Sequence, residues 1–523
     1  MDQITQLMEG FAAAITPYNL LFVLIGAVLG TAVGVLPGLG SSMAVALLLP
    51  ITFALDPTAA FIMFAGIYFG GLFGDSTAGI LLNTPGQGSA IASTFEGHRM
   101  ARNGQAAKAL ATAAIGAFIG GLISMTLVVF FAPYMVKLAT QFGPAEYFAL
   151  ALFAFAAISS VVADSIIRGL AALAIGLSLS FVGIDAPSGT PRYTFGVPQL
   201  FDGIDLVVIT VGILAIGEVF HIASRIKRDP DALKLSSNGI ARLSWADFKK
   251  ALPAWLRGTA FGAPFGMIPA GGAEVPTFLA YGTEKSLAKR NGDPEFGTTG
   301  SIKGLAAPEA AGNATAGTAM GTLLALGLPT SATAAIMLAA FQQYGMQPGP
   351  LLFERSGELV WTLLASLFIA LVVLLALNLF LAPLWARLLY IPQHYLYAGI
   401  TVVAALGIYA ISASQTDLII LLVLGFLGFL MRRYEVPLAP LLIGVILGPL
   451  AETELRRALA VSEGDIGALY SSPITIGIYL MLFAAIAISV VQHLRNIRRN
   501  NEGKEAAVDA AFEEAELTEE HRA

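Results

Sequence analysis

Long apolar runs alternate with short polar connections along most of this 523-residue chain. A helix that crosses the hydrocarbon core of a bilayer needs about 20 predominantly apolar residues. Runs of that kind recur from residue 18 to residue 493. The pattern predicts an all-α polytopic membrane protein with about 12 or more transmembrane segments.

Several apolar runs are too short, or too interrupted by Gly and Pro, to be simple spans. Gly and Pro break helices, and lipid cannot satisfy the backbone groups that a break releases. Broken helices at membrane depth are therefore tolerated only where protein or a cavity surrounds them. We expect half-helices or re-entrant hairpins near residues 42–56, 58–73, 258–284, 329–346 and 437–451.

The Gly- and Pro-rich breaks occur in two similar sets. The first set comprises Gly34–Ser41, Gly74–Gly79 and Asn83–Gly86. The second set comprises Gly266–Ala273, Gly312–Gly317 and Gly327–Ser331. Paired interruptions of this kind indicate the binding site of a transporter. Small residues are also common at helix contacts in membranes, so chance alignment and simple packing are the alternatives.

Lys and Arg in the connecting loops predict opposite orientations for the two sets. By the positive-inside rule, the basic loops 97–108, 223–257 and 285–303 are predicted to be cytoplasmic. The 50–57 connection has no Lys or Arg and the 347–357 loop is weakly charged, so both are predicted to lie outside. Because 285–303 is the counterpart of 50–57, and 347–357 that of 97–108, the repeats would have inverted topology.

This reasoning divides the chain into four parts. Residues 1–222 would form a first membrane repeat with scaffold helices, followed by a cytoplasmic linker at 223–257. Residues 258–495 would form the second membrane repeat with its own scaffold helices. Residues 496–523 are rich in Glu and Ala without an apolar run, which predicts an acidic cytoplasmic tail.

Composition excludes several classes of function. The chain is 56% hydrophobic and only 12% charged, which is about half the charged fraction of soluble proteins. It has no Cys and five scattered His, so disulfides, thiolate catalysis and Cys-ligated zinc are excluded. No basic arm suggests nucleic acid, and no Gly-x-x-x-x-Gly-Lys-Ser/Thr loop indicates an ATPase. Energy would then come from an ion gradient or another subunit, and no cofactor is expected beyond a coupling ion.

The breaks carry the groups expected of an anion site. Half-helix N-termini present free N–H groups and positive dipole ends, which suit a carboxylate. No Lys or Arg lies within the motif cores, so N–H groups, hydroxyls and a co-bound cation would hold the substrate. Gln87 and Ser89 are further polar groups in the first set. The expected substrate-binding residues are Pro37, Gly38, Gly40, Ser41, Ser42, Asn83, Thr84, Gly86, Gly271, Gly272, Pro329, Thr330 and Ser331.

Two carboxylates inside apolar sequence, Asp75 and Glu309, are functional candidates because charge in a membrane is costly. Cation coordination, proton coupling and support of a broken helix are the functional alternatives. The structural alternative is a carboxylate that caps a helix N-terminus. Glu274 either caps the second half of a hairpin or joins the site. The expected coupling-ion region, with Na⁺ as the ion, comprises Asp75, Ser76, Thr77, Glu309, Asn313, Thr315 and Thr333.

The motifs resemble those of the large membrane subunit of the tripartite tricarboxylate transporters, the TctA family. The resemblance covers roughly residues 15–495, with no departure in the motif cores, and leaves the acidic tail unexplained. The matching stretches are Gly34–Ser41, Gly70–Thr77, Leu82–Gly86, Phe95–His98, Gly266–Gly272, Ala307–Asn313 and Gly327–Ser331.

The resemblance implies a multi-pass permease of the bacterial inner membrane that works with two partners. One is a small four-span membrane subunit, similar to TctB. The other is a periplasmic solute-binding protein, similar to TctC, that delivers the substrate. Substrates of the family are mostly organic carboxylates such as citrate, and uptake is typically coupled to a cation gradient, commonly Na⁺.

We therefore predict a secondary active transporter of di- or tricarboxylates, and not an enzyme. An elevator-like displacement of the module that carries the hairpins fits this architecture. The alternatives are a carboxylate channel and a proton-coupled carrier that acts alone. An intramembrane enzyme would need a second catalytic carboxylate facing Asp75, and Glu309 is the candidate for that role.

Overall fold

Helices make up most of the described chain, as the apolar pattern predicts. In the described residues of this computed structural model, seven helices are long and apolar enough to cross a membrane, and five shorter apolar helices accompany them. The predicted all-α polytopic membrane fold is confirmed. The predicted tail, 496–523, lies outside the described residues. The structure describes residues 3–36, 39–52, 55–161, 166–185, 188–224, 240–268, 272–484 and 486–487.

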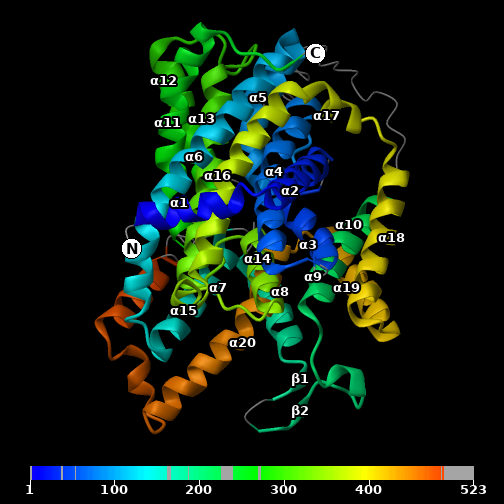
Figure 1. The fold of residues 1–523 in the computed structure, drawn as a ribbon, viewed down its shortest axis with the longest axis vertical. Helices are drawn as coiled ribbons and strands as arrows, with labels where there is room; N and C mark the ends of the chain where they lie inside the picture. The colour runs from blue at the N-terminus through cyan, green and yellow to red at the C-terminus, as the bar shows by residue number, and fades with distance from the viewer. Residues whose placement is uncertain are drawn as a thin grey trace, which may run out of the picture.

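Figure 1 labels most of the elements. The first repeat and the helices after it comprise α1 (Gln3–Ala14), α2 (Pro17–Val35), α3 (Ser41–Thr52), α4 (Pro57–Leu82), η1 (Gly88–Ala90), α5 (Ile91–Met100), η2 (Ala101–Gln105), α6 (Ala106–Ala139), α7 (Pro144–Val161), α8 (Ile166–Ser180), β1 (Gly183–Ile184), β2 (Pro191–Arg192), η3 (Pro198–Leu200), α9 (Leu206–Val211), η4 (Gly212–Ile216) and α10 (Gly217–Ala223). The second half comprises α11 (Trp245–Met267), α12 (Glu274–Asn291), α13 (Ile302–Leu326), α14 (Ala332–Gln343), α15 (Pro350–Arg355), α16 (Gly357–Phe380), α17 (Ala382–Leu388), α18 (Gln393–Ser412), α19 (Gln415–Arg433), α20 (Leu438–Val461) and η5 (Ile466–Tyr470).

Two helix pairs, α2 with α4 and α11 with α13, pack through matching stripes of glycine. A Cβ atom at the α2 glycines would lie only 2.2–2.6 Å from carbonyl oxygens of α4. At the α11 glycines the corresponding distances to carbonyl oxygens of α13 are 2.0–2.2 Å. Only glycine permits this backbone contact. The stripes are Gly26, Gly30 and Gly34 in α2, and Gly258, Gly262 and Gly266 in α11.

These stripes correct the alignment of the middle motif blocks. Gly34 packs against Gly71, and Gly266 packs against Thr315, so Gly71 and Thr315 hold equivalent places. Asp75 is therefore the counterpart of Ala319 in the second repeat. The predicted pairing of block 74–79 with block 312–317 is therefore wrong by six residues. Both blocks consist of small and polar residues, so they look alike in the sequence although they hold different places in the two repeats.

The two central helices, α4 and α13, end alike. Asn83 after α4 and Gly327 after α13 both adopt the left-handed conformation, with φ of 58° and 71°. Each donates its N–H to the carbonyl four residues earlier, of Gly79 and Leu323 respectively, as is common at helix C-termini. A short loop then leads to α5 in the first repeat and to α14 in the second.

Helix α4 is continuous, so the predicted half-helix at 58–73 is wrong. Every residue from Ala59 to Leu81 except Leu72 is buried, and the helix is surrounded by protein over its length. Its glycines serve close packing, since a Cβ at Gly74 would lie 2.4 Å from the Thr31 carbonyl oxygen of α2. The run 437–451 is likewise part of the continuous 24-residue helix α20.

Residues 97–108, 240–257 and 285–303, which are the described parts of the predicted cytoplasmic loops apart from the end of α10, lie towards one end of the molecule, at the top of Figure 1. The Asn103 side chain donates to the Thr299 carbonyl oxygen at 2.8 Å, and Lys108 Nζ lies 2.7 Å from an Asp247 oxygen. Helix α11 already begins at Trp245, capped by the Ser244 hydroxyl. The last third of the predicted linker is therefore helical.

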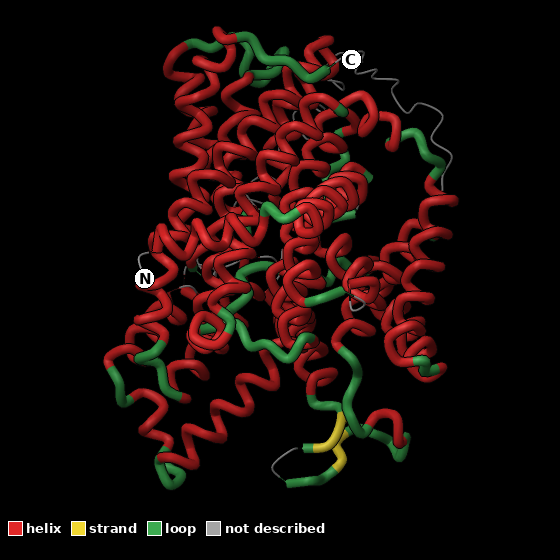
Figure 2. The backbone as a smooth tube through the Cα atoms, in the orientation of Figure 1, coloured by secondary structure: helices red, strands yellow, loops and turns green. Residues whose placement is uncertain are grey.

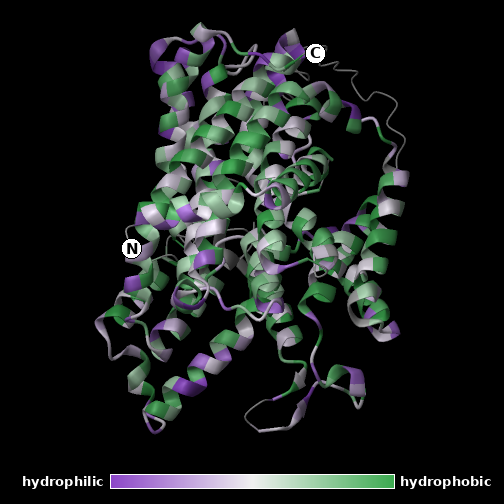
Figure 3. Cartoon of the chain, in the orientation of Figure 1, coloured by the Kyte–Doolittle hydropathy of each residue, from purple (hydrophilic) through white to green (hydrophobic). Residues whose placement is uncertain are grey.

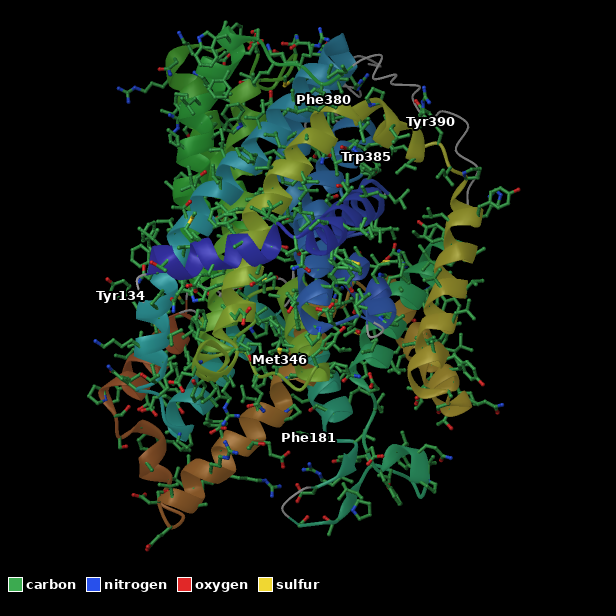
Figure 4. The ribbon with its side chains drawn as sticks, in the orientation of Figure 1. Tyr134, Phe181, Met346, Phe380, Trp385 and Tyr390 are labelled. Carbon is green, nitrogen blue, oxygen red and sulfur yellow. The ribbon has the colours of Figure 1, made fainter. Side chains whose placement is uncertain are left out.

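The ends of α3 and α14 meet further from the basic end, near the middle of the view in Figure 1. The Tyr344 hydroxyl donates to the Thr52 carbonyl oxygen at 2.6 Å. The small sheet of β1 and β2, antiparallel with Gly183 opposite Arg192, projects at the bottom of the view, at the end opposite the basic loops (Figure 2). Figure 4 places Phe181 there and Tyr390 at the basic end. Hydrophilic residues gather towards the two ends (Figure 3), as expected of a chain that spans a bilayer.

Candidate functional site

Within each repeat, the two breaks lie against each other. In the first repeat, a Cβ at Gly86 would lie 3.0 Å from the Leu39 carbonyl oxygen. In the second repeat, the Gly272 N–H donates to the Thr330 carbonyl oxygen at 3.0 Å. Each repeat therefore presents one compact broken region, where the chain leaves one helix and starts another.

The two broken regions meet crosswise. The Ser41 hydroxyl at the start of α3 lies 3.0 Å from the Thr333 hydroxyl in the first turn of α14. Gly88 at the start of η1 packs against Glu274 at the start of α12, with 2.9 Å between its ideal Cβ and the Glu274 Cγ. The N-termini of α3, α14, α12 and the η1–α5 segment therefore meet at one junction.

Two of the N-cap residues at this junction provide no capping side chain of their own. No side chain accepts a hydrogen bond at the N-cap of η1, which is Gln87, or of α12, which is Ala273. Helix α14 has one such bond, from the Ala334 N–H to the Ser331 hydroxyl at 3.2 Å. Uncapped helix N-termini bind anions through their free N–H groups.

Gln87 joins the two breaks of the first repeat at the junction. Its Oε1 accepts a hydrogen bond from the Ser41 hydroxyl at 3.1 Å. Its buried Nε2 finds no hydrogen-bond acceptor among the described residues. A buried donor without an acceptor is uncommon in proteins and calls for an explanation such as an absent ligand. Sequence reasoning counted Gln87 only as an additional polar group, although its position directly after Pro85-Gly86 marks a helix start.

Asp75 holds the loop between α4 and η1 in place. One carboxylate oxygen accepts the Gly86 N–H and the other accepts the Gln87 N–H, the latter at 3.1 Å. Both oxygens of Asp75 are thus engaged by backbone donors. This arrangement resembles the helix-capping alternative considered for Asp75.

Glu309 lies beside Asp75 but uses its oxygens differently. Its carboxylate accepts the Ser76 hydroxyl at 2.7 Å and also interacts with the Ser93 hydroxyl, whereas the buried Oε1 makes no hydrogen bond of normal geometry among the described residues. Asn313 Oδ1, one helical turn further along α13, is likewise buried without a hydrogen-bond donor among the described residues. A cavity of about 20 Å³ lies between these groups. Its polar lining residues are Asp75, Ser76, Ser89, Ser93, Glu309 and Asn313.

Several predicted residues lie away from this cavity. Thr315 donates to the Gly262 and Ala311 carbonyl oxygens at 3.0 and 2.9 Å, so it belongs to the contact between α11 and α13. Thr333 joins Ser41 at the junction of the helix starts, and Thr77 is buried outside the cavity lining.

The predicted substrate residues fall into four groups. Ser41, Gly86, Gly272, Thr330 and Ser331 take part in the contacts of the junction. Gly40 packs against the Gln87 side chain, and Pro329 is buried beside Thr330. Asn83 and Thr84 are exposed and Ser42 is half-buried. Pro37, Gly38 and Gly271 lie outside the described residues.

Charge at the two breaks is one-sided. Asp75, Glu274 and Glu309 are buried or largely buried near the junction, and Glu274 Oε2 has no donor among the described residues. No Lys or Arg occurs in the motif cores. Uncompensated buried charges are strongly destabilising, so the arrangement favours a bound cation near these carboxylates.

Comparison with known proteins identifies the family. The chain is 39% identical over 499 residues to a 52.8 kDa protein of the TAR-I ttuC' 3' region of Agrobacterium vitis, an alignment that covers 95% of this chain and 98% of the relative. A second protein, of the TAR-II ttuC' 3' region, is 36% identical over 237 residues, or 45% of this chain and 97% of the relative. No solved structure matches. The model of the tripartite tricarboxylate transporter TctA family matches residues 20–443, and the chain belongs to that family.

Proposed function

We propose that this TctA-family membrane protein is the permease subunit for uptake of an organic di- or tricarboxylate, driven by a cation gradient with Na⁺ as the ion. The observation that carries the proposal is the meeting of helix N-termini from both repeats around Gln87, without Lys or Arg. A substrate carboxylate would accept hydrogen bonds from the free N–H groups, from Gln87 Nε2 and from the Ser41 hydroxyl.

A cation is needed for such a site to hold an anion. The carboxylates of Asp75, Glu274 and Glu309 repel a substrate carboxylate, and no basic side chain in the motif cores offsets them. A co-bound Na⁺ would offset part of this negative charge. Substrate and ion would therefore bind better together than separately, which is the thermodynamic requirement of a symporter.

A cavity lies on the side of the molecule that carries β1 and β2, and its lining extends to the end of α13. It has a volume of about 480 Å³ and is bounded by α8, α9, α14 and α20. It reaches from exposed residues such as Asp202 and Gln342 to Gly327, where α13 ends. By the positive-inside rule this end faces the outside, so the cavity supports entry of the substrate from the periplasm.

We further propose the partners and the motion. The permease would lie in the bacterial inner membrane with a small four-span membrane subunit. A periplasmic solute-binding protein would deliver the substrate at the end that carries β1 and β2. The module formed by the broken helices and their glycine-packed neighbours would then move against the remaining helices, in the manner of an elevator.

Uptake of labelled citrate or another di- or tricarboxylate into proteoliposomes that contain all three components tests the proposal. We expect accumulation that requires an imposed Na⁺ gradient. Accumulation that persists after the Na⁺ and proton gradients are collapsed would exclude ion coupling. Accumulation that follows a proton gradient alone would identify a proton-coupled carrier, and downhill flux without the binding protein would identify a channel.

A further inference from the structure

We propose that Glu309 and Asn313 bind the coupling cation, and that Asp75 is not a ligand of this cation. Asp75 instead transmits the presence of the cation to the loop that carries Gly86 and Gln87. This inference rests on the proposed function only in taking that loop as part of the substrate site.

The cavity between α4, α5 and α13 has the size and the lining of a small-cation site. Its volume of about 20 Å³ accommodates one particle of the size of a water molecule. Glu309 and Asn313 are only 4% and 3% exposed, and each has a buried oxygen without a donor among the described residues. Ser89 and Ser93, from the other repeat, add hydroxyl oxygens to the polar part of the lining, beside the apolar Leu72, Ala90 and Pro308.

The number of carboxylates favours a monovalent cation. Oxygen-only sites for Ca²⁺ use 6–8 oxygen ligands, often several carboxylates. Here Glu309 Oε1 is the carboxylate oxygen of the cavity that accepts no hydrogen bond among the described residues, whereas each oxygen of Asp75 already accepts one from a backbone N–H group. No group of three or more His, Asp or Glu residues among the described residues is arranged to hold a metal. The chemistry therefore fits Na⁺ bound by one carboxylate, one amide oxygen and hydroxyls.

Asp75 lies in the wall of the same cavity but faces the substrate loop. Its carboxylate fixes the backbone of Gly86 and Gln87. Without a cation, the carboxylates of Asp75 and Glu309 repel each other across a buried space. A cation at Glu309 offsets this repulsion, so that Asp75 keeps its charge and its hold on the loop. Occupancy of the ion site then orders the Gln87 side chain that we propose to bind substrate.

Two measurements on the purified permease separate ion binding from substrate binding. The first is the thermal unfolding midpoint in NaCl and in choline chloride at equal ionic strength, without substrate. A ligand that binds only the folded state raises this midpoint. The second is the Kd of a radiolabelled carboxylate with and without Na⁺.

We expect Na⁺ to raise the midpoint of the unmodified protein by a few degrees, and this rise to be lost in Glu309→Gln and Asn313→Ala. Asn378→Ala is the matched control. Asn378 is also buried and donates to the carbonyl oxygen four residues earlier, as Asn313 does, but it lies in α16 away from the cavity. This control should keep the Na⁺-dependent rise. If Glu309→Gln does not fold, Asn313→Ala decides the question alone.

Asp75→Asn should keep the Na⁺-dependent rise in the midpoint and lose the Na⁺ dependence of carboxylate binding. If Glu309→Gln or Asn313→Ala kept the full Na⁺-dependent rise in the unfolding midpoint, the proposal that these residues bind the cation would be wrong. Loss of the rise in Asp75→Asn would make Asp75 a ligand and overturn its role as transmitter. Because the rise is measured without substrate, a failure to bind or transport any carboxylate would count against the proposed function and not against the ion site.

Discussion

Single residues at the breaks act through what their polar atoms contact. Asp75 and Glu309 are both buried carboxylates in apolar sequence, but backbone N–H groups occupy both oxygens of one and leave an oxygen of the other free. The Ser41 hydroxyl has a similarly specific place, because it lies between the Gln87 and Thr333 side chains and so joins the two repeats.

Ser41→Ala should weaken substrate binding. The change removes a hydroxyl that orients Gln87, and a buried hydrogen bond contributes about 1 kcal/mol, so the Kd should rise by about 5-fold or more. Ser366→Ala is the control, since Ser366 is equally buried but bonds only the Leu363 carbonyl of its own helix. Radioligand binding gives the Kd of each variant. Equal affinities for both variants would show that Ser41 does not contribute to substrate binding.

At the scale of elements, the glycine stripes explain why α2 and α11 each end where they do. Each stripe brings two helix backbones into contact as far as Gly34 or Gly266, and a break follows within a few residues. The stripe therefore fixes the break relative to the long central helix α4 or α13. These glycines therefore pack the helices closely and, through that packing, also position the site.

Gly262→Ala should destabilise the fold markedly. Its Cβ would lie 2.1 Å from the Ala311 carbonyl oxygen, so α11 and α13 must separate. Overpacking of this kind typically costs about 1–3 kcal/mol or more. Gly282→Ala in α12 is the control, since nothing lies within 4 Å of its Cβ and Ala favours a helix by about 1 kcal/mol. Thermal unfolding should give a lower midpoint for the first variant and an unchanged or higher one for the second.

The β1–β2 hairpin should loosen in acid. Hydrogen bonds from Ser188, together with the charges of Arg456 and Arg192, hold the pKa of Asp185 below its ordinary value. A carboxyl whose pKa is lowered by folding stabilises the folded form above its unfolded pKa, about 3.9, and loses this contribution as the pH falls through its folded pKa. The hairpin should therefore be fixed at neutral pH and mobile below about pH 4.

Fluorescence anisotropy of a dye on Phe195→Cys measures this mobility, because the chain has no other Cys and Phe195 is 87% exposed. Adding Asp185→Asn should give low anisotropy at every pH. Equal anisotropy at neutral pH with and without Asp185→Asn would show that Asp185 does not hold the hairpin.

At the scale of the whole molecule, the inverted topology predicts which residues face which side of the membrane. Single-Cys variants Phe195→Cys, near the hairpin, and Ser286→Cys, in α12 near the basic end, should react with a membrane-impermeant maleimide from opposite sides. In spheroplasts the first should be labelled directly and the second only after permeabilisation. Labelling of both from one side would contradict the inversion.

The sequence predicted the fold class and the two breaks, because Gly, Pro and loop charge act locally and are visible in one dimension. It placed Asp75, Ser76, Glu309 and Asn313 in one region, as the structure does. It could not show that Thr315 packs against α11, because the helix neighbour of a residue depends on rotation about the helix axis. The continuity of α4 and the six-residue offset between the blocks likewise depend on contacts between helices, which the sequence alone does not show.

In the elevator-like cycle that we propose, the one-sided charge of the two breaks has an electrical consequence. An empty module that carries ionised Asp75 and Glu309 would move negative charge through the membrane field. Each elementary charge that crosses the full field gains or loses about 2.3 kcal/mol per 100 mV. With the cell interior negative, the membrane potential would drive the empty module outward. The resting voltage of the cell would then power the reset of the carrier, whereas the charge of the loaded module would depend on its cargo.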